Sequence, residues 1–443
     1  MAGPRLKRTL GLFDSVMINL GAIIGAGIFV VIGIAVDRAG PSIIVSLLLG
    51  AAIAVLTGLS FSEIALHVTK EGGVYEFAKE TIGSFPGFMS GWTWNIGNII
   101  LVSAVLISMG SYINALFGTH IAVYYFAIPG LALFTAINML GMRNSAKTIR
   151  WLVFVNIAAL LIFVAAGSFF FKAGNFSAFM PNGISGTLAG TAIIFFAFTG
   201  FSRIATVAGE VKDPKRNVSR AILISIVAST ILYLAVAAVA VGMLNYVSLG
   251  HSASPLSSAI SIIGSPALDI AIALGGVAAT AGVAFTGILG VSRVYFAMGR
   301  DNKLPRTFGR LNRFATPGNA ILLTSLMTAM FILFVNFGLI VRLADAGVLV
   351  AYGIINIAAF RMSTKKKGSD FIRSRYFPVI PVLGLISVAT LVAYLGYETI
   401  LITALILVAG AAFYTLWNRG RHGKVPRISA VRTFGPSRHS TAQ

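Results

Sequence analysis

The chain has 443 residues, of which 57% are hydrophobic and 11% are charged, and its 34 Lys and Arg against 13 Asp and Glu leave a net charge of +21. Soluble globular domains carry about 25% charged residues, so this composition excludes a soluble fold and predicts a membrane protein. The absence of cysteine excludes disulfides, a thiolate metal site and a cysteine nucleophile.

Twelve stretches of the chain are apolar over about 20 residues, the length that a helix needs to cross a membrane. The first is too long and too rich in glycine for a cleavable signal peptide, so we expect it to remain in the membrane. Because twelve is an even number, both termini should lie on one side. The predicted spans are 11–36, 42–66, 87–117, 121–140, 150–171, 187–209, 221–246, 268–297, 317–337, 339–360, 378–396 and 398–418.

Basic residues alternate along the connections between these spans. Of the 34, 29 lie at the N-terminus, in every second connection and in the C-terminal tail. The opposite connections hold only Arg38, Lys172 and Arg342, while Arg203 and Arg293 fall inside spans. The positive-inside rule then predicts a multi-pass protein of the cell membrane with both termini in the cytoplasm. We expect the basic loops to contact anionic lipid head groups, and we expect no nucleic-acid partner.

Two predicted spans are interrupted near their middle. The first carries Gly21, Gly25 and Gly27 within seven residues, although glycine in a helix interior costs about 1 kcal/mol relative to alanine. A packing face of small residues is the alternative explanation. The sixth span carries Gly200 and Arg203 at mid-segment. Interruptions at matching positions of two five-span halves indicate an inverted-repeat transporter.

An interrupted membrane helix has free backbone groups that can bind a ligand. Free amides suit a carboxylate and free carbonyls suit an ammonium, and a zwitterionic amino acid presents both groups. We therefore predict substrate binding by two sets of residues: Ile23, Gly25, Ala26 and Gly27 for the carboxylate, and Phe196, Ala197, Phe198 and Thr199, with Gly200 beside them, for the ammonium.

Several motifs follow one another in a fixed order. They are residues 21–29; Glu63 with Gly72-Gly73-Val74-Tyr75 and Gly83; residues 196–200 with 210–216; and residues 292–301 with Pro305 and Thr316-Pro317. In this order they resemble the amino acid/polyamine/organocation permeases over residues 10–420. The resemblance implies an all-α polytopic fold of 12 transmembrane helices, with the five-plus-five inverted-repeat (LeuT-like) core of neurotransmitter-sodium symporters. It divides the chain into an N-terminus (1–10), two repeats (11–171 and 187–360), two added helices (378–418) and a basic cytoplasmic tail (419–443).

The resemblance also implies roles for single residues. Gly25 to Gly27 match the substrate-binding motif, and Phe196 and Phe198 match aromatic positions beside that site. Asn98 matches a position that hydrogen-bonds substrate, although an amide there equally suits helix–helix packing. Phe285 is a candidate gate in the eighth span, with simple packing as its alternative.

Two departures from the family pattern concern the coupling ion. Asn156 stands where proton-coupled members often have a lysine, and asparagine has no titratable proton. Ser202 and Arg203 stand where many members have an acidic residue. The coupling ion is thus left open between H⁺ and Na⁺, with Thr280, Thr286 and Ser292 as weak candidates for sodium ligands. We expect no other cofactor and no metal.

The remaining ionisable groups inside spans are functional candidates by default. We interpret Glu63 as structural, with a coupling role as the alternative. We expect Asp345 to form an ion pair with Arg342 at the rim of the tenth span, with a relay role as the alternative. Arg203 and Arg293 are expected to snorkel or to form an inner-gate ion pair. A sharper hypothesis is that Arg203 faces the cavity and favours an anionic substrate.

These features predict a secondary active transporter that moves amino acids by alternating access. The alternatives are an amino-acid or polyamine exchanger, and a transporter-like sensor without net transport. A channel would need a continuous charged or carbonyl lining. An enzyme would need clustered acid, base or metal-binding groups, whereas the five histidines are scattered.

Overall fold

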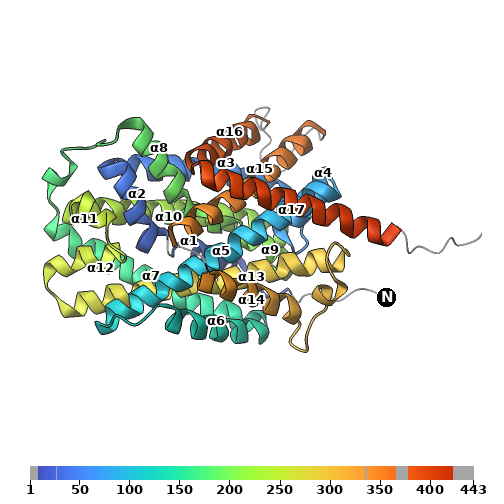
Figure 1. Cartoon of the computed structure of the whole chain (residues 1–443), viewed down its shortest axis with the longest axis horizontal. Coiled ribbons are helices and arrows are strands. Elements are labelled where there is room, and N and C mark those ends of the chain that lie inside the picture. The colour runs from blue at the N-terminus through green and yellow to red at the C-terminus, as the bar shows by residue number, and fades with distance from the viewer. Residues whose placement is uncertain (1–7, 26, 335–336, 366–377, 423–443) are drawn as a thin grey trace, which may run out of the picture.

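The structure of the protein is a computed structural model that describes residues 8–25, 27–334, 337–365 and 378–422 (Figure 1). Helices make up most of this part of the chain, and its only β-type pairing is a single parallel bridge between Leu10 and Val211. The predicted all-helical class is therefore confirmed.

The helices follow the order of the predicted spans. The first half contains α1 (Leu12–Ile23), η1 (Gly27–Val31), α2 (Ile32–Ala39), η2 (Gly40–Ser42), α3 (Ile43–Ala65), α4 (Gly73–Ile82), α5 (Ser84–Phe117), α6 (Tyr124–Met139), α7 (Met142–Gly167), η3 (Ser168–Phe170) and η4 (Ala173–Phe176). The second half contains α8 (Gly183–Ile194), η5 (Phe195–Ser202), α9 (Arg203–Thr206), η6 (Ala208–Glu210), α10 (Pro214–Met243), α11 (Tyr246–Gly250), α12 (Pro255–Ile260), η7 (Ser261–Ile263), α13 (Pro266–Arg300), η8 (Arg306–Gly309), α14 (Gly318–Phe334), α15 (Phe337–Lys365), α16 (Val379–Tyr394) and α17 (Tyr397–His422).

Eight helical segments of the described chain are long and apolar enough to cross a membrane. One of them, Leu12–Ala65, contains both the first and the second predicted span. Three further apolar helices, in the fourth, ninth and eleventh predicted spans, are shorter: Tyr124–Met139, Gly318–Leu333 and Val379–Tyr394. The chain is therefore a multi-pass membrane protein.

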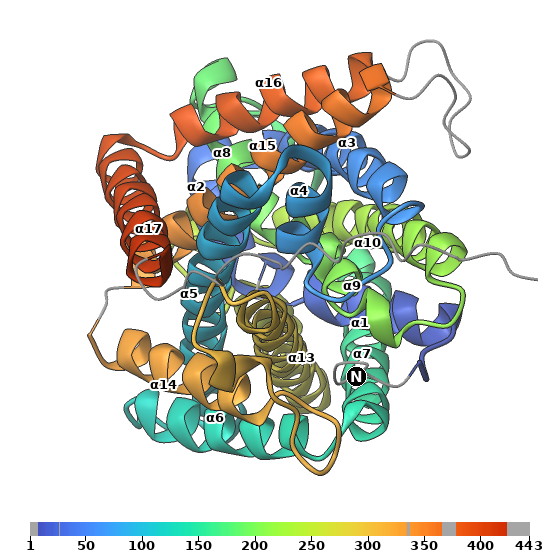
Figure 2. The same ribbon diagram turned by 90° about the vertical axis from the view of Figure 1, so that its right-hand side faces the viewer.

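Two groups of helices face each other (Figure 2). In the α10 group, α10 packs on α1 and α3, and α3 packs on α8 and its continuation η5. In the α5 group, α5 packs on α13, α6 and α14. Helix α7 contacts both α1 and α13, and α15 contacts both α5 and α3, so these two helices connect the groups. Helices α16 and α17 lie at the periphery, against α15.

Small residues allow the long helices to pack closely. A Cβ on Gly97 of α5 would lie 2.9 Å from the carbonyl oxygen of Ala344 in α15, so the two backbones are in contact. On α13, a Cβ on Gly290 would lie 3.1 Å from the ring of Trp94 in α5. Close backbone approach at small residues is a main source of helix association in membranes.

The predicted interruption of the first span is present, whereas the sixth span differs from the prediction. Helix α1 ends at Ile23, Ile24 is extended with φ −80° and ψ 92°, and a π-helix begins at Gly27. The sixth span does not unwind: α8 continues into an eight-residue 3₁₀ helix, η5, which keeps a tighter pattern of internal hydrogen bonds. Runs of 3₁₀ helix longer than three or four residues are uncommon and often mark a functional hinge.

Candidate functional site

The two interrupted segments lie against each other in the middle of the fold. A Cβ on Gly27 would overlap the Cα and Cβ of Ala197, and a Cβ on Gly200 would overlap the carbonyl group of Ala22. Each contact brings one backbone onto another, so these positions require glycine. The structure thus brings the two predicted sets of substrate-binding residues together, except that Ala26 lies outside the described residues.

Tyrosine hydroxyls bind carbonyl groups of the first span and of η5. Tyr233 lies 2.6 Å from the carbonyl oxygen of Ile23 and 3.2 Å from that of Ala197. Tyr112 donates to the carbonyl of Phe29. Buried backbone groups without a partner cost about 1–3 kcal/mol each, so these hydroxyls stabilise the interruption. A carbonyl oxygen has two lone pairs, so a second acceptor position remains for a ligand.

A third tyrosine connects η5 to α15. The hydroxyl of Tyr352 donates to the carbonyl of Thr199 and lies 2.9 Å from the hydroxyl of Ser202. The ring packs edge-on against Phe61 and tilted against Phe201. Our sequence analysis missed all three tyrosines, although a tyrosine in an apolar helix is a usable signal because its buried hydroxyl needs a partner.

Two asparagines hold the first span on either side of its interruption. The side-chain amide of Asn156 in α7 donates to the carbonyl of Ile24, so Asn156 lies beside the predicted site. The side-chain oxygen of Asn19 accepts from the amide of Ile204 at 2.9 Å, which joins α1 to α9. Asn19 was also missed from the sequence.

Arg203 lies between the two helix groups. Its Nη2 donates to the side-chain oxygen of Asn98 at 2.7 Å, and its guanidinium stacks on Trp94 with 5.0 Å to the ring centre. The side chain is only 1% exposed and forms no ion pair among the described residues, so it does not snorkel. The other end of Asn98 donates to the carbonyl of Trp94 at 2.8 Å. Both ends of the Asn98 amide therefore bind protein groups.

Other candidates are placed less centrally. The ring of Phe198 packs edge-on against Tyr233 at 5.4 Å, and that of Phe285 packs edge-on against Phe134 at 6.0 Å. Glu63 is buried near the end of α3. The three hydroxyls considered as sodium ligands donate to carbonyls of their own helix: Thr280 to Gly276, Thr286 to Gly282 and Ser292 to Leu289.

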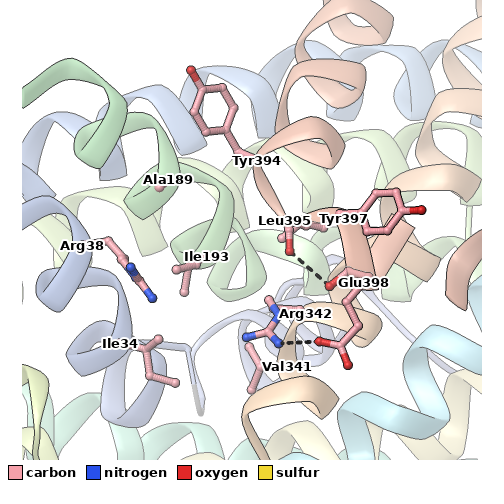
Figure 3. A pocket seen from close by; sticks show the side chains of 12 residues that line it. Ile34, Arg38, Ala189, Ile193, Val341, Arg342, Tyr394, Leu395, Tyr397 and Glu398 are labelled. Carbon is pink, nitrogen blue, oxygen red and sulfur yellow. Dashed lines mark hydrogen bonds and ion pairs between the residues drawn. The ribbon is translucent and has the colours of Figure 1, made fainter. Parts of the chain in front are cut away.

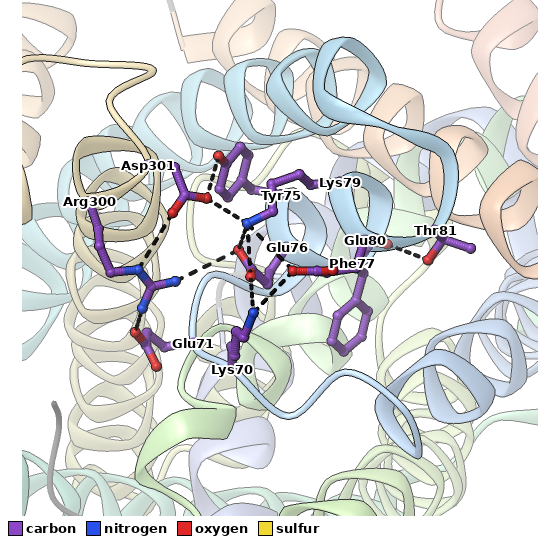
Figure 4. A network of polar contacts seen from close by, with 10 residues as sticks. All are labelled: Lys70, Glu71, Tyr75, Glu76, Phe77, Lys79, Glu80, Thr81, Arg300 and Asp301. Carbon is purple, nitrogen blue, oxygen red and sulfur yellow. Dashed lines mark hydrogen bonds and ion pairs between the residues drawn. The ribbon is translucent and has the colours of Figure 1, made fainter. Parts of the chain in front are cut away.

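An ionic network joins α4 and the segment before it to the end of α13 (Figure 4). Lys79 lies 2.5 Å from Asp301 and 2.9 Å from Glu76. Arg300 pairs with Glu71. The hydroxyl of Tyr75 donates to Asp301 at 2.8 Å. This network ties the α3–α4 connection to the α5 group at the end of the molecule where the N-terminus lies.

The network carboxyls differ in pKa. Burial raises the pKa of Glu76 above its usual value, although Lys79 opposes the shift. Burial also acts to raise the pKa of Asp301, but the hydrogen bonds from Lys79 and Tyr75 outweigh it and lower the pKa below its usual value. Asp301 therefore stabilises the network in its ionised form.

A second ion pair lies deeper on the same side. Nε of Arg293 in α13 lies 3.1 Å from Glu210, and both side chains are almost fully buried. The expected inner ion pair is therefore present for Arg293, with Glu210 as its partner. The backbone of Glu210 also accepts from the amides of Thr9 and Leu10, which places the chain before α1 against the connection after η6.

A cavity of about 370 Å³ lies at the opposite end of the molecule, between α2, α8, α15 and the junction of α16 and α17 (Figure 3). Its lining includes Arg38 and Arg342, two of the three basic residues that the charge pattern placed on the outer side. Arg342 lies 3.7 Å from Glu398 of α17. The expected ion pair between Arg342 and Asp345 is therefore wrong, because α17 supplies the partner and Asp345 is buried at 1% exposure.

Comparison with known proteins agrees with this architecture. Residues 14–416 match the profile of the amino acid permease family. The methylthioribose transporter of Bacillus subtilis (strain 168) is 31% identical over 401 residues, 86% of each chain. The branched-chain amino acid permease BcaP of the same organism is 30% identical over 443 residues, 95% of each chain. The chloroplastic cationic amino acid transporter 9 of Arabidopsis thaliana is 30% identical over 333 residues, 70% of this chain and 58% of that protein.

The tyrosine contacts predict a loss of stability. Replacing Tyr233 by Phe leaves the carbonyls of Ile23 and Ala197 without this donor, so we expect the free energy of unfolding in detergent to fall by about 1–3 kcal/mol. Tyr397→Phe is the matched control, because that side chain is 76% exposed. An equal stability of the Tyr233→Phe variant and wild type would contradict the role of this hydroxyl.

The lowered pKa of Asp301 predicts that this residue contributes to the stability of the folded protein in a pH-dependent way. Since the folded-state pKa lies below the unfolded value of 3.8, the stabilisation is complete above that pH and is lost as the pH falls through the folded-state value. We expect Asp301→Asn to lower the melting temperature at pH 7 by about 2–4 °C, the shift that ~1 kcal/mol produces in a medium-sized domain. The difference should shrink below pH 3.8. The exposed Asp37 provides the control variant, Asp37→Asn. A difference in melting temperature between wild type and Asp301→Asn that stays constant with pH would show that the ionised form of Asp301 does not cause the stabilisation.

Proposed function

The chain belongs to the amino acid permease family, and we propose that it is a secondary active transporter that moves an amino acid across the cell membrane by alternating access. The observation that carries this proposal is the contact between the two interrupted segments, Gly27 on Ala197 and Gly200 on Ala22. Interrupted helices that meet inside a membrane protein are how transporters of this type form a binding site from backbone groups.

We propose a fold of twelve spans, with a five-plus-five inverted-repeat (LeuT-like) core and two added helices. Each half begins with an interrupted segment: α1 and α2 in the first, and α8, η5 and α9 in the second. The third segments of the two halves, α5 and α13, are the longest helices, with 34 and 35 residues, and they pack on each other. The peripheral position of α16 and α17 fits helices added outside the core.

In the proposed site, the amides of residues 25–27 bind the substrate carboxylate and the carbonyls of residues 196–200 bind its ammonium. Positive helix ends and free amides favour anions, and free carbonyls favour cations. Asn156 holds the first span through the carbonyl of Ile24. The wall of the site on the side of the ionic network is formed by Asn98, Ser202 and Arg203.

We propose that access to the cytoplasm opens when the α10 group moves away from the α5 group. The contacts that must break are those that join the two groups: Arg203 with Asn98, and Glu210 with Arg293. The network around Lys79 and Asp301 keeps the same end closed. At the other end, the cavity between α2, α8 and α15 offers a route to the outside.

The orientation follows from charge. We propose that both termini and the ionic network face the cytoplasm, because 29 of the 34 basic residues lie on that side by the predicted topology. Anionic lipid head groups are then natural contacts for the basic loops, and nothing calls for a nucleic-acid partner.

The relatives are named for different cargoes: methylthioribose, branched-chain amino acids and cationic amino acids. A sequence identity near 30% does not distinguish between these cargoes. We therefore propose amino acids as the substrate class and do not assign one particular amino acid. The alternatives are exchange of amino acids or polyamines, and a sensor that binds without net transport. The coupling ion is H⁺ or Na⁺, and no other cofactor is needed.

A reconstitution experiment tests this proposal. Purified protein in liposomes should take up at least one of a panel of labelled amino acids above the level of protein-free liposomes, with proton and sodium gradients imposed separately. Binding without uptake would favour the sensor. Uptake only into liposomes preloaded with unlabelled amino acid or polyamine would favour the exchanger.

The site itself predicts the effect of one substitution. Gly27→Leu should abolish uptake, because even a Cβ at this position overlaps Ala197 and the side chain would displace the two segments that form the site. We expect the variant still to insert and fold. The matched control is Gly174→Leu, since a Cβ on Gly174 has no neighbour within 4 Å. Normal uptake by the Gly27→Leu variant would contradict the assignment of the site.

A further inference from the structure

Asp345 is a buried acidic residue, and no basic residue in the described part of the chain forms an ion pair with it. Its side chain is 1% exposed, and neither carboxylate oxygen has a hydrogen-bond partner among the described residues. The nearest basic residue along its own helix, Arg342, pairs with Glu398 instead. An unpaired carboxylate buried in this way is strongly disfavoured when ionised.

The position of Asp345 follows from helix geometry. Val341 of α15 and Ile193 of α8 line the same cavity, and about one turn further into the molecule lie Asp345 and Ala197. Tyr352, two turns beyond Asp345 on the same face of α15, hydrogen-bonds to Thr199. This face of α15 therefore looks onto η5, and Asp345 lies at the depth of the interrupted segment.

The surroundings contain few other titratable groups. Among the elements packed against α15, η5 and α8 have none, and α5 has only Tyr112, which binds the carbonyl of Phe29. The other described ones lie toward the two ends of the fold or on α15 itself: Glu63 on α3; Tyr75, Glu76, Lys79 and Glu80 on α4; Tyr394 on α16; Tyr397, Glu398, Tyr414 and Arg419 on α17; and Arg342, Tyr352 and Arg361 on α15. Of these, Tyr352 is close enough to Asp345 to interact with it electrostatically.

We propose that Asp345 binds the proton that is transported together with the substrate, an inference that rests on the proposed transport function. When the cavity lined by Val341 extends further into the molecule, water reaches the carboxyl group of Asp345. Contact with water allows this group to ionise. A proton from external water then binds a carboxylate oxygen, which allows the site to close over a neutral group. The same proton returns to water on the cytoplasmic side once the contacts of Arg203 and Arg293 have opened.

This assignment accounts for the substitutions near the two interruptions. Asn156 and Ser202 occupy the places where the family resemblance leads us to expect a lysine and an acid, and neither has a proton to release at neutral pH. Asp345 supplies a titratable group on α15, two helical turns from Tyr352, which binds Ser202. The competing role for an unpaired carboxylate at this depth is to bind a cationic group of the substrate.

The test uses the full chain in liposomes and compares Asp345→Asn with wild type. The substrate is the amino acid that gives the highest counterflow, the exchange of labelled for unlabelled amino acid without any ion gradient. With the membrane potential clamped at zero and a pH difference of one unit, acid outside, one proton per substrate supports an accumulation ratio of about ten. We expect this ratio for wild type and a ratio near one for Asp345→Asn, with counterflow kept within about twofold. Asp345→Glu should restore the accumulation, and Asp269→Asn, at the start of α13, should leave it unchanged.

Each other result overturns the inference. Accumulation by Asp345→Asn equal to wild type would show that the proton binds elsewhere. Loss of counterflow in a variant with an unchanged melting temperature would assign Asp345 to substrate binding. Wild-type counterflow without proton-driven accumulation would exclude proton coupling while leaving the transport function intact, whereas no counterflow with any amino acid would refute the proposed function itself.

Discussion

Every backbone polar group inside a lipid bilayer needs a partner within the protein, and this constraint shapes the centre of the structure. The break in the first span and the 3₁₀ segment of the sixth span carry carbonyl groups that accept hydrogen bonds from side chains. Three tyrosines and an asparagine from neighbouring helices bind them: Tyr112, Tyr233, Tyr352 and Asn156. The same contacts position the interruptions, so the groups that stabilise the break also define the candidate site.

The charged residues of the core divide into paired and unpaired groups. Arg293 and Glu210 form a buried ion pair between the helix groups, so separating those groups requires breaking it. Arg203 and Asp345 are buried without an ion-pair partner in the described chain. Unpaired charge within a membrane is expensive and is therefore usually functional. The paired residues suit a closing contact, and the unpaired ones suit binding of a ligand or a proton.

The sequence predicted the helices and the interruption of the first span well, because both depend on local properties. Apolar length sets where a helix can cross a membrane, and clustered glycines weaken a helix at a definite place. Side-chain partners were predicted poorly. Asp345 and Arg342 are three residues apart on one helix, yet Arg342 pairs with Glu398, 56 positions further along the chain. Likewise, no local signal joined Lys79 to Asp301.

By itself, the sequence determined that this is an all-helical membrane protein, and its motifs indicated the permease family. It also located the interruption in the first span and the contact residue Gly200 in the sixth. Only the tertiary structure decided that the sixth span continues as a 3₁₀ helix, that tyrosines bind the released carbonyls, and that Asp345 is buried at the depth of the site. The reason is physical: periodicity and hydropathy are properties of neighbouring residues, whereas the partner of a buried polar group depends on which helices pack together.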